Sequence, residues 1–251
     1  MPRSASNWSH IFPGIRREGQ SFNRAFTYFD DFHSAGYARD LALSAESDPA
    51  GGKFSEVIDA SEWHVTNIDG GADNGETILI ADARNGVLAI TTNDANDDAV
   101  TVQKNGESIG IAAGKDFVFE AKIKLSDVDK ADLMIGLCIT DTTLLPGITD
   151  GLYFRIADGT ASRELIAVAE KDSVETTLST GVSLVDDTFV TVRFEVFGSD
   201  RAVVYVNGVN KGELTTNLPD DELLAVAAEV RNAGAQVNTL SADYCLAVQD
   251  R

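Results

Sequence analysis

The stretch FEAKIKLSDVDKADLMIGLCITD, Phe119–Asp141, carries two strand-like runs on either side of an acidic turn. Around the first run, apolar side chains alternate with mostly polar ones, as in a strand that has one buried face and one wet face. The predicted buried set is Phe117, Phe119, Ala121, Ile123 and Leu125. The second run, LMIGLCIT (133–140), is apolar at every position but two, which is typical of a central strand covered on both sides.

Strand-like runs separated by turn residues continue along the chain at intervals of roughly 8–12 residues, the pattern of a β-sandwich or barrel. They lie at 26–32, 56–67, 76–82, 86–92, 99–104, 116–125, 132–140, 151–157, 164–171, 174–179, 188–197, 201–207, 210–215, 222–231 and 237–248. The segment 41–47 is expected to form a short helical turn. Between two runs, Asn207-Gly208 predicts a type I′ hairpin turn. The sequence thus predicts one antiparallel β-sandwich domain over residues 26–251, preceded by an extended arm over residues 1–25.

The charge is strongly negative and unevenly distributed. Twenty Lys and Arg stand against forty Asp and Glu in the 251 residues, a formal net charge of −20 that disfavours nucleic acid and anionic membranes as partners. Residues 1–29 carry four Arg and one Glu, a net charge of +3, which leaves −23 for residues 30–251. The arm and the body are therefore expected to attract opposite partners.

The two cysteines, Cys138 and Cys245, each lie in an apolar strand-like run and are interpreted as buried thiols. The N-terminus lacks the apolar core of a signal peptide, and no run approaches the roughly 20 apolar residues of a membrane span. Synthesis in a cytoplasm without a visible export signal is the expectation.

Sugar cleavage requires two carboxylates that face one cleft, which in a sandwich usually means acids alternating along one strand. FEAKIKL resembles the strand before the catalytic one in laminarinase-like glucanases, whose next strand carries a Glu-x-Asp-x-x-Glu pattern. Here the next strand has no acid between Asp132 and Asp141, which fall at opposite ends of it. The sequence therefore predicts that the chain is not an enzyme and has no catalytic residues. The histidines, His10, His33 and His64, show no nucleophile context, and GIAAGKD (110–116) lacks the full spacing of a phosphate loop.

Calcium is the cofactor alternative, with no cofactor the favoured prediction. The clusters NIDGGADNGE (67–76) and TNDANDDA (92–99) supply the oxygen ligands that this cation prefers. Tight turns require the same residue types, so turns are the favoured interpretation, as for Asp30-Asp31 and Asp186-Asp187. Sugar binding without cleavage would use exposed aromatics, with Trp63, Tyr37 and Tyr153 as candidates, although a core role is favoured for them.

A series of phrases in order resembles a family of tailed-bacteriophage virion proteins. The phrases are YFDDF, EWHVT, FEAKIKLSDVDKADLMIGLCITDT, TDGLYFRIADG, AVAEKDS, DDTFVTVRFEV, VYVNGV, TNLPDDELLAV and DYCLAVQDR, within residues 26–251. The resemblance implies a concanavalin-A-like jelly roll (the lectin/glucanase sandwich) and a structural role in the virion, as a capsid decoration or cement protein. It transfers no catalytic residues.

On this hypothesis the protein docks on the major capsid protein, and on copies of itself, at the capsid surface. A segment that orders on contact can wrap over a neighbour, so the arm is the predicted docking element. Its predicted contact residues are Trp8, Phe12, Arg16, Arg17 and Phe22. The alternative is a lectin-like carbohydrate-binding module on the virion surface or tail that adheres to host glycans.

Overall fold

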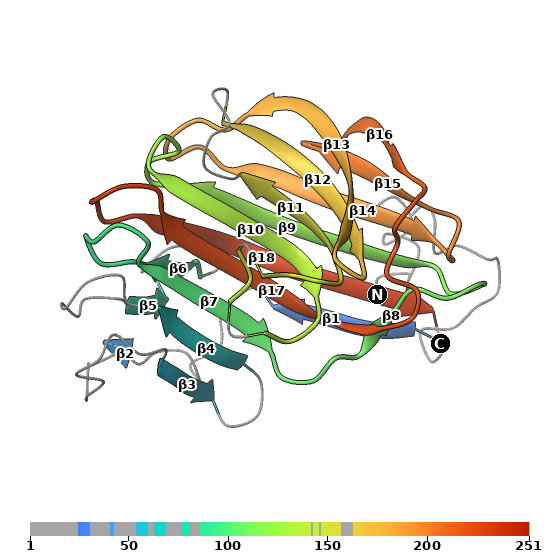
Figure 1. The fold of residues 1–251 in the computed structure, drawn as a ribbon, viewed down its shortest axis with the longest axis horizontal. Coiled ribbons are helices and arrows are strands. Elements are labelled where there is room, and N and C mark those ends of the chain that lie inside the picture. The colour runs from blue at the N-terminus through green and yellow to red at the C-terminus, as the bar shows by residue number, and fades with distance from the viewer. Residues whose placement is uncertain are drawn as a thin grey trace, which may run out of the picture.

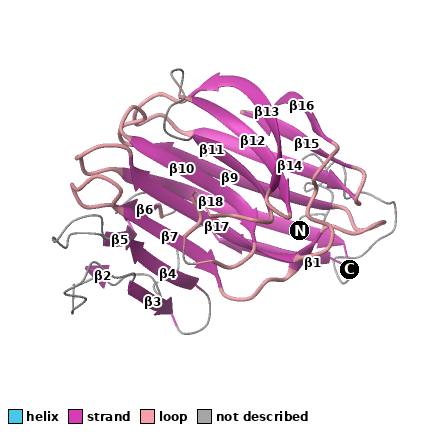
Figure 2. Cartoon of the chain, viewed as in Figure 1, coloured by secondary structure: helices cyan, strands magenta, loops and turns pink. Residues whose placement is uncertain are grey.

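The computed structural model describes residues 25–30, 41–42, 54–59, 63–68, 77–80, 86–141, 143–145, 147–156 and 163–250. These residues form 18 strands, all in antiparallel sheets, and no helix. Two nine-stranded sheets, here sheet A and sheet B, lie face to face as a sandwich (Figure 1, Figure 2). Across the described ranges, nothing qualifies as a helix that could span a membrane. The predicted all-β antiparallel sandwich is confirmed. The arm lies outside the described residues.

Sheet A contains β1 (Ala25–Asp30), β2 (Leu41–Ala42), β5 (Thr77–Ile80), β6 (Leu88–Thr91), β9 (Phe117–Leu125), β14 (Val190–Phe197), β15 (Arg201–Val206), β16 (Val209–Leu214) and β18 (Thr239–Asp250). Its strand order is β16-β15-β14-β9-β18-β6-β5-β2. On the side of β18 away from β9, β6 pairs with the first part of β18 and β1 pairs with the last part.

Sheet B contains β3 (Phe54–Asp59), β4 (Trp63–Ile68), β7 (Ala99–Lys104), β8 (Ile109–Gly110), β10 (Ala131–Cys138), β11 (Gly151–Ile156), β12 (Glu164–Lys171), β13 (Val174–Ser183) and β17 (Leu223–Asn232). Its strand order is β13-β12-β11-β10-β17-β7-β4-β3, and β8 pairs with β17. The central strands of the two sheets come from distant parts of the sequence.

The strands of the stretch 119–141 lie in different sheets, β9 in sheet A and β10 in sheet B. The acidic turn between them therefore crosses from one layer to the other. All five residues predicted to face inward from β9 belong to the main hydrophobic core. Every residue of β10 is buried, as predicted for a strand covered on both faces.

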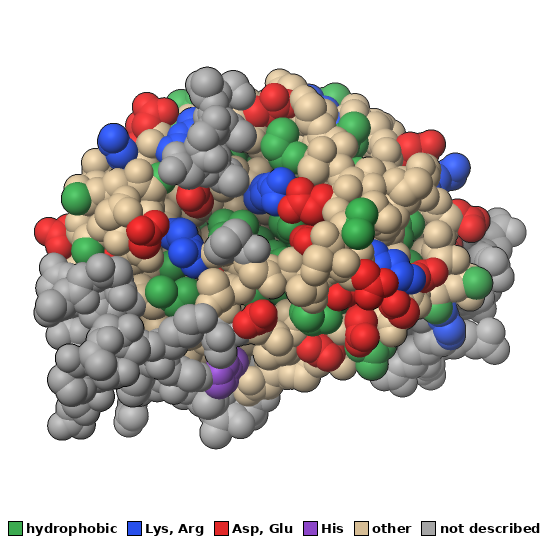
Figure 3. All heavy atoms as spheres, in the orientation of Figure 1, with side chains coloured by type: hydrophobic (Ala, Val, Ile, Leu, Met, Phe, Trp, Pro, Cys, Tyr) green, Lys and Arg blue, Asp and Glu red, His purple; other side chains and the backbone are tan. Residues whose placement is uncertain are grey.

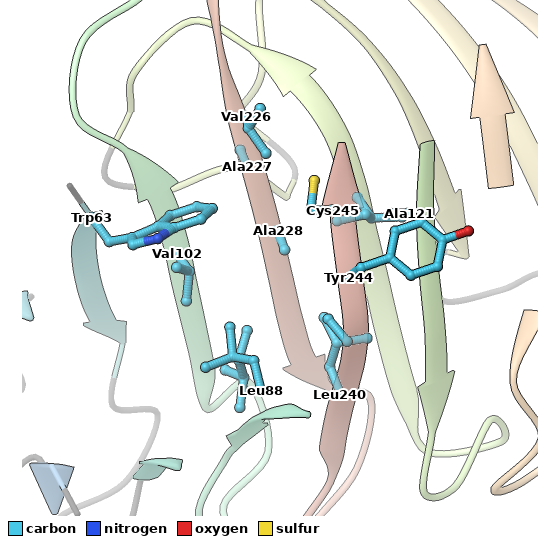
Figure 4. Close-up of a pocket in the computed structure, with 13 residues that line it drawn as sticks. Trp63, Leu88, Val102, Ala121, Val226, Ala227, Ala228, Leu240, Tyr244 and Cys245 are labelled. Atoms are coloured by element: carbon cyan, nitrogen blue, oxygen red, sulfur yellow. The ribbon is translucent and has the colours of Figure 1, made fainter. Parts of the chain in front are cut away.

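The core between the sheets is built from these inward faces. Phe154 of β11 and Phe194 of β14 stack across the two sheets with ring centroids 4.3 Å apart. A cavity of about 20 Å³ remains beside Trp63, Val102 and Leu240 (Figure 4). That volume holds about one water molecule, so the cavity offers no room for a ligand.

Local predictions had mixed outcomes. Asn207 and Gly208 have φ of 51° and 74°, the positive values that a type I′ turn requires, so the predicted hairpin is confirmed. The helical turn predicted at 41–47 is wrong where the structure describes it, because Leu41–Ala42 pair with β5 as a strand. The run 56–67 holds parts of two strands, β3 and β4, which pair with each other.

Candidate functional site

The outer face of sheet B, which looks away from sheet A, gathers polar side chains from neighbouring strands. Directly opposed residues on antiparallel strands point to the same face, so the pairing register defines the set. It includes His64, Thr66, Thr101, Gln103, Asp132, Tyr153, Arg155, Glu164, Glu170, Glu175, Thr177, Ser179, Glu229 and Arg231. Figure 3 looks onto this face and shows Lys and Arg side chains beside Asp and Glu side chains near its centre.

The segment between β10 and β11 covers part of this face. Its residues Leu144, Leu145 and Ile148 are buried. They form a second hydrophobic cluster with Met134, Cys138, Tyr153, Val168 and Ala227. This cluster is the reason why β10 is buried on its outer side as well as its inner side.

Glu229 of β17 anchors the covering segment. Its side chain is fully buried and accepts hydrogen bonds from the backbone N–H groups of Leu144 at 3.0 Å and Leu145 at 3.2 Å. Thr101 Oγ1 donates at 2.9 Å, and Arg231 Nε donates at 3.0 Å. A buried carboxylate with four donors is satisfied in place, so Glu229 serves to hold the segment 139–150 on the sheet.

Beside the covering segment, four residues of β11–β13 form a polar cluster that we name the Glu170–Glu175 cluster. They are Tyr153, which the segment covers, and Arg155, Glu170 and Glu175. Tyr153 donates a 2.7 Å hydrogen bond to Glu170 Oε2. Arg155 holds both carboxylate oxygens of Glu175, with 2.7 Å between Nη2 and Oε2. Tyr153 and Glu170 are buried, whereas Glu175 is exposed. The cluster therefore joins a buried acid and an exposed acid.

A tight hairpin brings the two acids together. Asp172 and Ser173 have positive φ of 51° and 63°, and they connect β12 to β13. This two-residue turn pairs Lys171 with Val174, so the next pair is Glu170 opposite Glu175. The Cβ atoms of such opposed residues lie about 4.5–5.5 Å apart.

Burial governs the electrostatics of the buried half of the cluster. Desolvation raises the pKa of Glu170, and the nearby Glu175 charge raises it further, while the Tyr153 hydrogen bond opposes both effects. Burial also raises the pKa of the Tyr153 hydroxyl, and its hydrogen bond to the Glu170 carboxylate adds to the shift. Burial thus shifts the equilibrium of Glu170 toward its neutral carboxyl form.

Among the aromatic candidates for sugar binding, Trp63 is 4% exposed and belongs to the main core, and Tyr153 is 1% exposed under the covering segment. The favoured core interpretation is confirmed for both. Tyr37 lies outside the described residues, as do the capsid-docking candidates Trp8, Phe12, Arg16, Arg17 and Phe22. Cys138 and Cys245 are buried thiols that are not joined in a disulfide, as predicted.

The calcium candidate at 92–99 forms a tight turn around Asn232. The side-chain amide of Asn232 donates hydrogen bonds to the carbonyl oxygens of Asn93 at 2.6 Å and Ala95 at 2.8 Å. This amide group therefore occupies the space between the two carbonyl oxygens. No group of three or more His, Cys, Asp or Glu side chains that could hold a metal occurs in the described part of the chain. Of the other cluster, 67–76, only Asn67 and Ile68 are described, and both belong to β4.

Comparison with known proteins gives likeness in structure only. No protein-family model and no curated protein sequence matches the chain. A structure described with endo-acting O-glycanases of the human gut microbiota has a TM-score of 0.58 at 12% identity, covering 88% of this chain and 98% of that one. An endo-1,3-beta-glucanase from Streptomyces sioyaensis has a TM-score of 0.56 at 13% identity, covering 92% and 98%. The potassium-bound carbohydrate recognition domain of Emp46p has a TM-score of 0.53 at 11% identity, covering 84% and 96%.

These likenesses establish the fold as the concanavalin-A-like lectin/glucanase jelly roll. They also overturn the prediction that the chain is not an enzyme, because an endo-glucanase and endo-acting O-glycanases share its fold over most of its length. The prediction rested on the lack of alternating acids along a single strand, whereas Glu170 and Glu175 lie opposite each other on two adjacent strands. At such low identity the likeness extends to the fold alone, and the chain is a jelly roll of the kind found in carbohydrate-recognising and glycan-active proteins.

Proposed function

We propose that the protein binds a glycan on the outer face of sheet B, at the Glu170–Glu175 cluster. The observation that carries the proposal is the Arg155–Glu175 pair, which lies partly open to solvent with side-chain exposures of 24% and 33%. Behind it, the Tyr153–Glu170 hydrogen bond is buried and fixes the floor of the site. The fold shared with carbohydrate recognition and glycanase proteins supports the same ligand class.

The chemistry of the site suits a polar ligand. A planar guanidinium and a planar carboxylate offer fixed donors and acceptors, which match the neighbouring hydroxyl groups of a sugar ring. On β13, the exposed side chains of Thr177 and Ser179 lie on the same face and add hydroxyl groups. Within the described ranges, the exposed large hydrophobic residues are aliphatic rather than aromatic. Recognition is therefore proposed to rest on hydrogen bonds more than on stacking.

The opposed carboxyl groups support glycoside hydrolysis as a second candidate function. Retaining glycosidases hold two carboxyl groups about 5–5.5 Å apart, one of raised pKa as the acid and one as the nucleophile. In this role Glu170 gives its proton to the glycosidic oxygen, the bond between that oxygen and the anomeric carbon breaks, and the leaving sugar departs as an alcohol. The carboxylate of Glu175 bonds to the anomeric carbon in the same step. A water molecule then displaces Glu175 from the anomeric carbon and gives a proton back to Glu170.

A glycan array with the full chain tests binding, followed by titration of any glycan that is retained. We expect Arg155→Ala to weaken binding at least tenfold. Arg201→Ala is the matched control, because Arg201 forms an exposed ion pair with Glu213 in sheet A. An array without signal for the unmodified chain, or equal affinity of Arg155→Ala, contradicts the binding proposal.

Product analysis tests hydrolysis separately. The unmodified chain should release reducing ends from the retained glycan, whereas Glu170→Gln and Glu175→Gln should release none. Binding without any release removes hydrolysis and leaves glycan binding in place.

A further inference from the structure

The outer face of sheet A contains an apolar group where a sandwich would usually present polar side chains. The group comprises Val118 of β9, Val203 of β15, and Leu246 and Val248 of β18. Their sequence neighbours Phe117, Phe119, Ala202, Val204, Cys245 and Ala247 belong to the main core. Because side chains alternate along a strand, the four residues point away from the core.

These four outward-facing side chains are nevertheless buried. Val118 is 2% exposed, Val248 6%, Leu246 7% and Val203 8%. Neither hydrophobic cluster of described residues includes any of them. The face is thus covered by contacts other than those of the two described clusters.

The register places the four residues on one continuous surface. Val118 lies directly opposite Val248 on one side and Glu195 on the other, and Glu195 lies opposite Val203. Leu246 is two residues from Val248 on the same face, opposite Glu120. Four strands, β15, β14, β9 and β18, therefore share one surface.

The charged groups of this surface are also largely withdrawn from water. Glu195 is 7% exposed, and it pairs with Arg193, whose side chain is 15% exposed. Arg193 Nε is buried and has no hydrogen-bond partner among the residues that the structure describes. Glu120 and Tyr205 also contact this pair, and Lys122 farther along β9 keeps a side-chain exposure of 37%. The burial of Val118, Val203, Leu246 and Val248 therefore indicates a cover over this part of the face.

The start of β1 identifies the segment that can reach this surface. Ala25 pairs with Asp250, two residues along β18 from Val248, so residues 1–24 enter the fold beside the apolar group. Val203 lies three strand spacings from β18, or about 14 Å. A chain of 24 residues spans up to about 80 Å when extended. The segment carries Trp8, Ile11, Phe12, Ile15 and Phe22, together with four Arg and one Glu.

We propose that residues 1–24 dock on the outer face of the same molecule's sheet A, with their apolar side chains packed on Val118, Val203, Leu246 and Val248. This docking gives the arm a partner within its own chain. Contact of Trp8, Phe12 or Phe22 with a capsid would then require release of the arm from sheet A.

Paramagnetic broadening in the full chain tests the proposal. A nitroxide attached to Ser9→Cys reports on nearby methyl groups, and Cys138 and Cys245 are buried, so they remain unlabelled. We expect broadening of the methyl signals of Val118, Val203, Leu246 and Val248. The methyl signals of Val174, which is 55% exposed on β13 of sheet B, serve as the control and should stay sharp.

A mixed sample separates docking within one molecule from docking between two copies. Isotope-enriched chain without the label is mixed with labelled chain at natural isotope abundance. Broadening confined to the sample that carries label and isotope on one molecule supports the proposal. Broadening in the mixed sample identifies a second copy as the occupant and overturns it, as does the absence of broadening at all four residues.

Val203→Asp supplies a second readout. A carboxylate on the covered surface should release the arm and restore sharp signals at Val118 and Val248, whereas the matched control Val174→Asp should leave them broadened. Persistent broadening in a folded Val203→Asp protein overturns the proposal. If that variant does not fold, the broadening measured in the labelled Ser9→Cys chain, which carries no other change, decides whether the arm docks on sheet A.

Discussion

Glu170 and Glu175 face each other across the β12–β13 hairpin, and the hairpin gives them opposite environments. Glu170 is buried and accepts a hydrogen bond from Tyr153, whereas Glu175 is exposed and is held by Arg155. The same backbone turn thus creates a carboxyl group that resists ionisation beside one that carries an ion pair. Such a difference between neighbouring acids is the arrangement on which acid catalysis and selective hydrogen bonding both depend.

The protonation of Glu170 should depend on Tyr153. Its hydrogen bond favours the charged carboxylate and lowers the pKa of Glu170, against the stronger effect of burial. Tyr153→Phe should therefore raise the pKa of Glu170 further, as measured by carbon NMR of the side-chain carboxyl group through a pH titration. An unchanged or lower pKa in the variant would contradict this account of the cluster.

The raised pKa of Glu170 also makes a prediction about stability. A carboxyl group whose folded pKa exceeds its unfolded value favours the fold while it is protonated, and this contribution is lost as pH rises through the folded pKa. As pH rises above about 4.3, the ordinary pKa of Glu, the free energy of unfolding of Glu170→Gln should therefore increase relative to that of the unmodified chain. Urea unfolding of both proteins across pH 4–8 measures the difference between the two free energies of unfolding. If the free energy of Glu170→Gln fell relative to that of the unmodified chain as pH rose, the raised pKa of Glu170 would be contradicted.

Loss of the Glu229 carboxylate should release the segment 139–150. Removing one partner from a buried, charged network leaves the others unpaired, so Glu229→Ala should lower the free energy of unfolding by about 3–5 kcal/mol. Hydrogen exchange at the amides of Leu144 and Leu145, which donate to this carboxylate, should accelerate. Glu213→Ala is the control, because Glu213 is exposed and its change should stay within about 0.5 kcal/mol.

Gly136 should not tolerate a side chain. A Cβ atom at this position would stand 2.5 Å from Tyr153 Cα and 2.6 Å from the carbonyl oxygen of Leu152, both backbone atoms of β11. Gly136→Ala should therefore destabilise the protein by about 1–3 kcal/mol through overpacking. At Gly234 the nearest atom would be Lys130 Cδ at 3.5 Å, so Gly234→Ala should be close to neutral in the same thermal or urea unfolding experiment.

The capsid role implied by the family resemblance stays a prediction. Deleting residues 1–25 should leave the sandwich folded and abolish attachment to capsids, measured as copies per particle after co-purification. Full occupancy by the shortened chain would rule out the arm as the docking element. This outcome would leave the docking of the arm on sheet A untouched, since that is measured in the isolated protein.

The features that the sequence determined are local ones. Alternation along 117–125 identified the inward face of β9, and Asn207-Gly208 identified a hairpin, because both depend on side-chain period and backbone preference within a few residues. The apolar run at 133–140 likewise identified a strand buried on both faces. The sandwich class follows from many such short signals in succession.

The tertiary structure decided the features that join distant segments. Arg155 reaches Glu175 only because three strands pair in one register, and Glu229 meets Thr101 from 128 residues away. Val118 shares the polar side of its strand with Glu120 and Lys122, yet it is buried, because burial depends on what lies over the sheet and not on the period of the strand. The sequence by itself specified strands and turns, whereas the pairing of strands across the chain decided which acids meet and which side chains of a sheet face are buried.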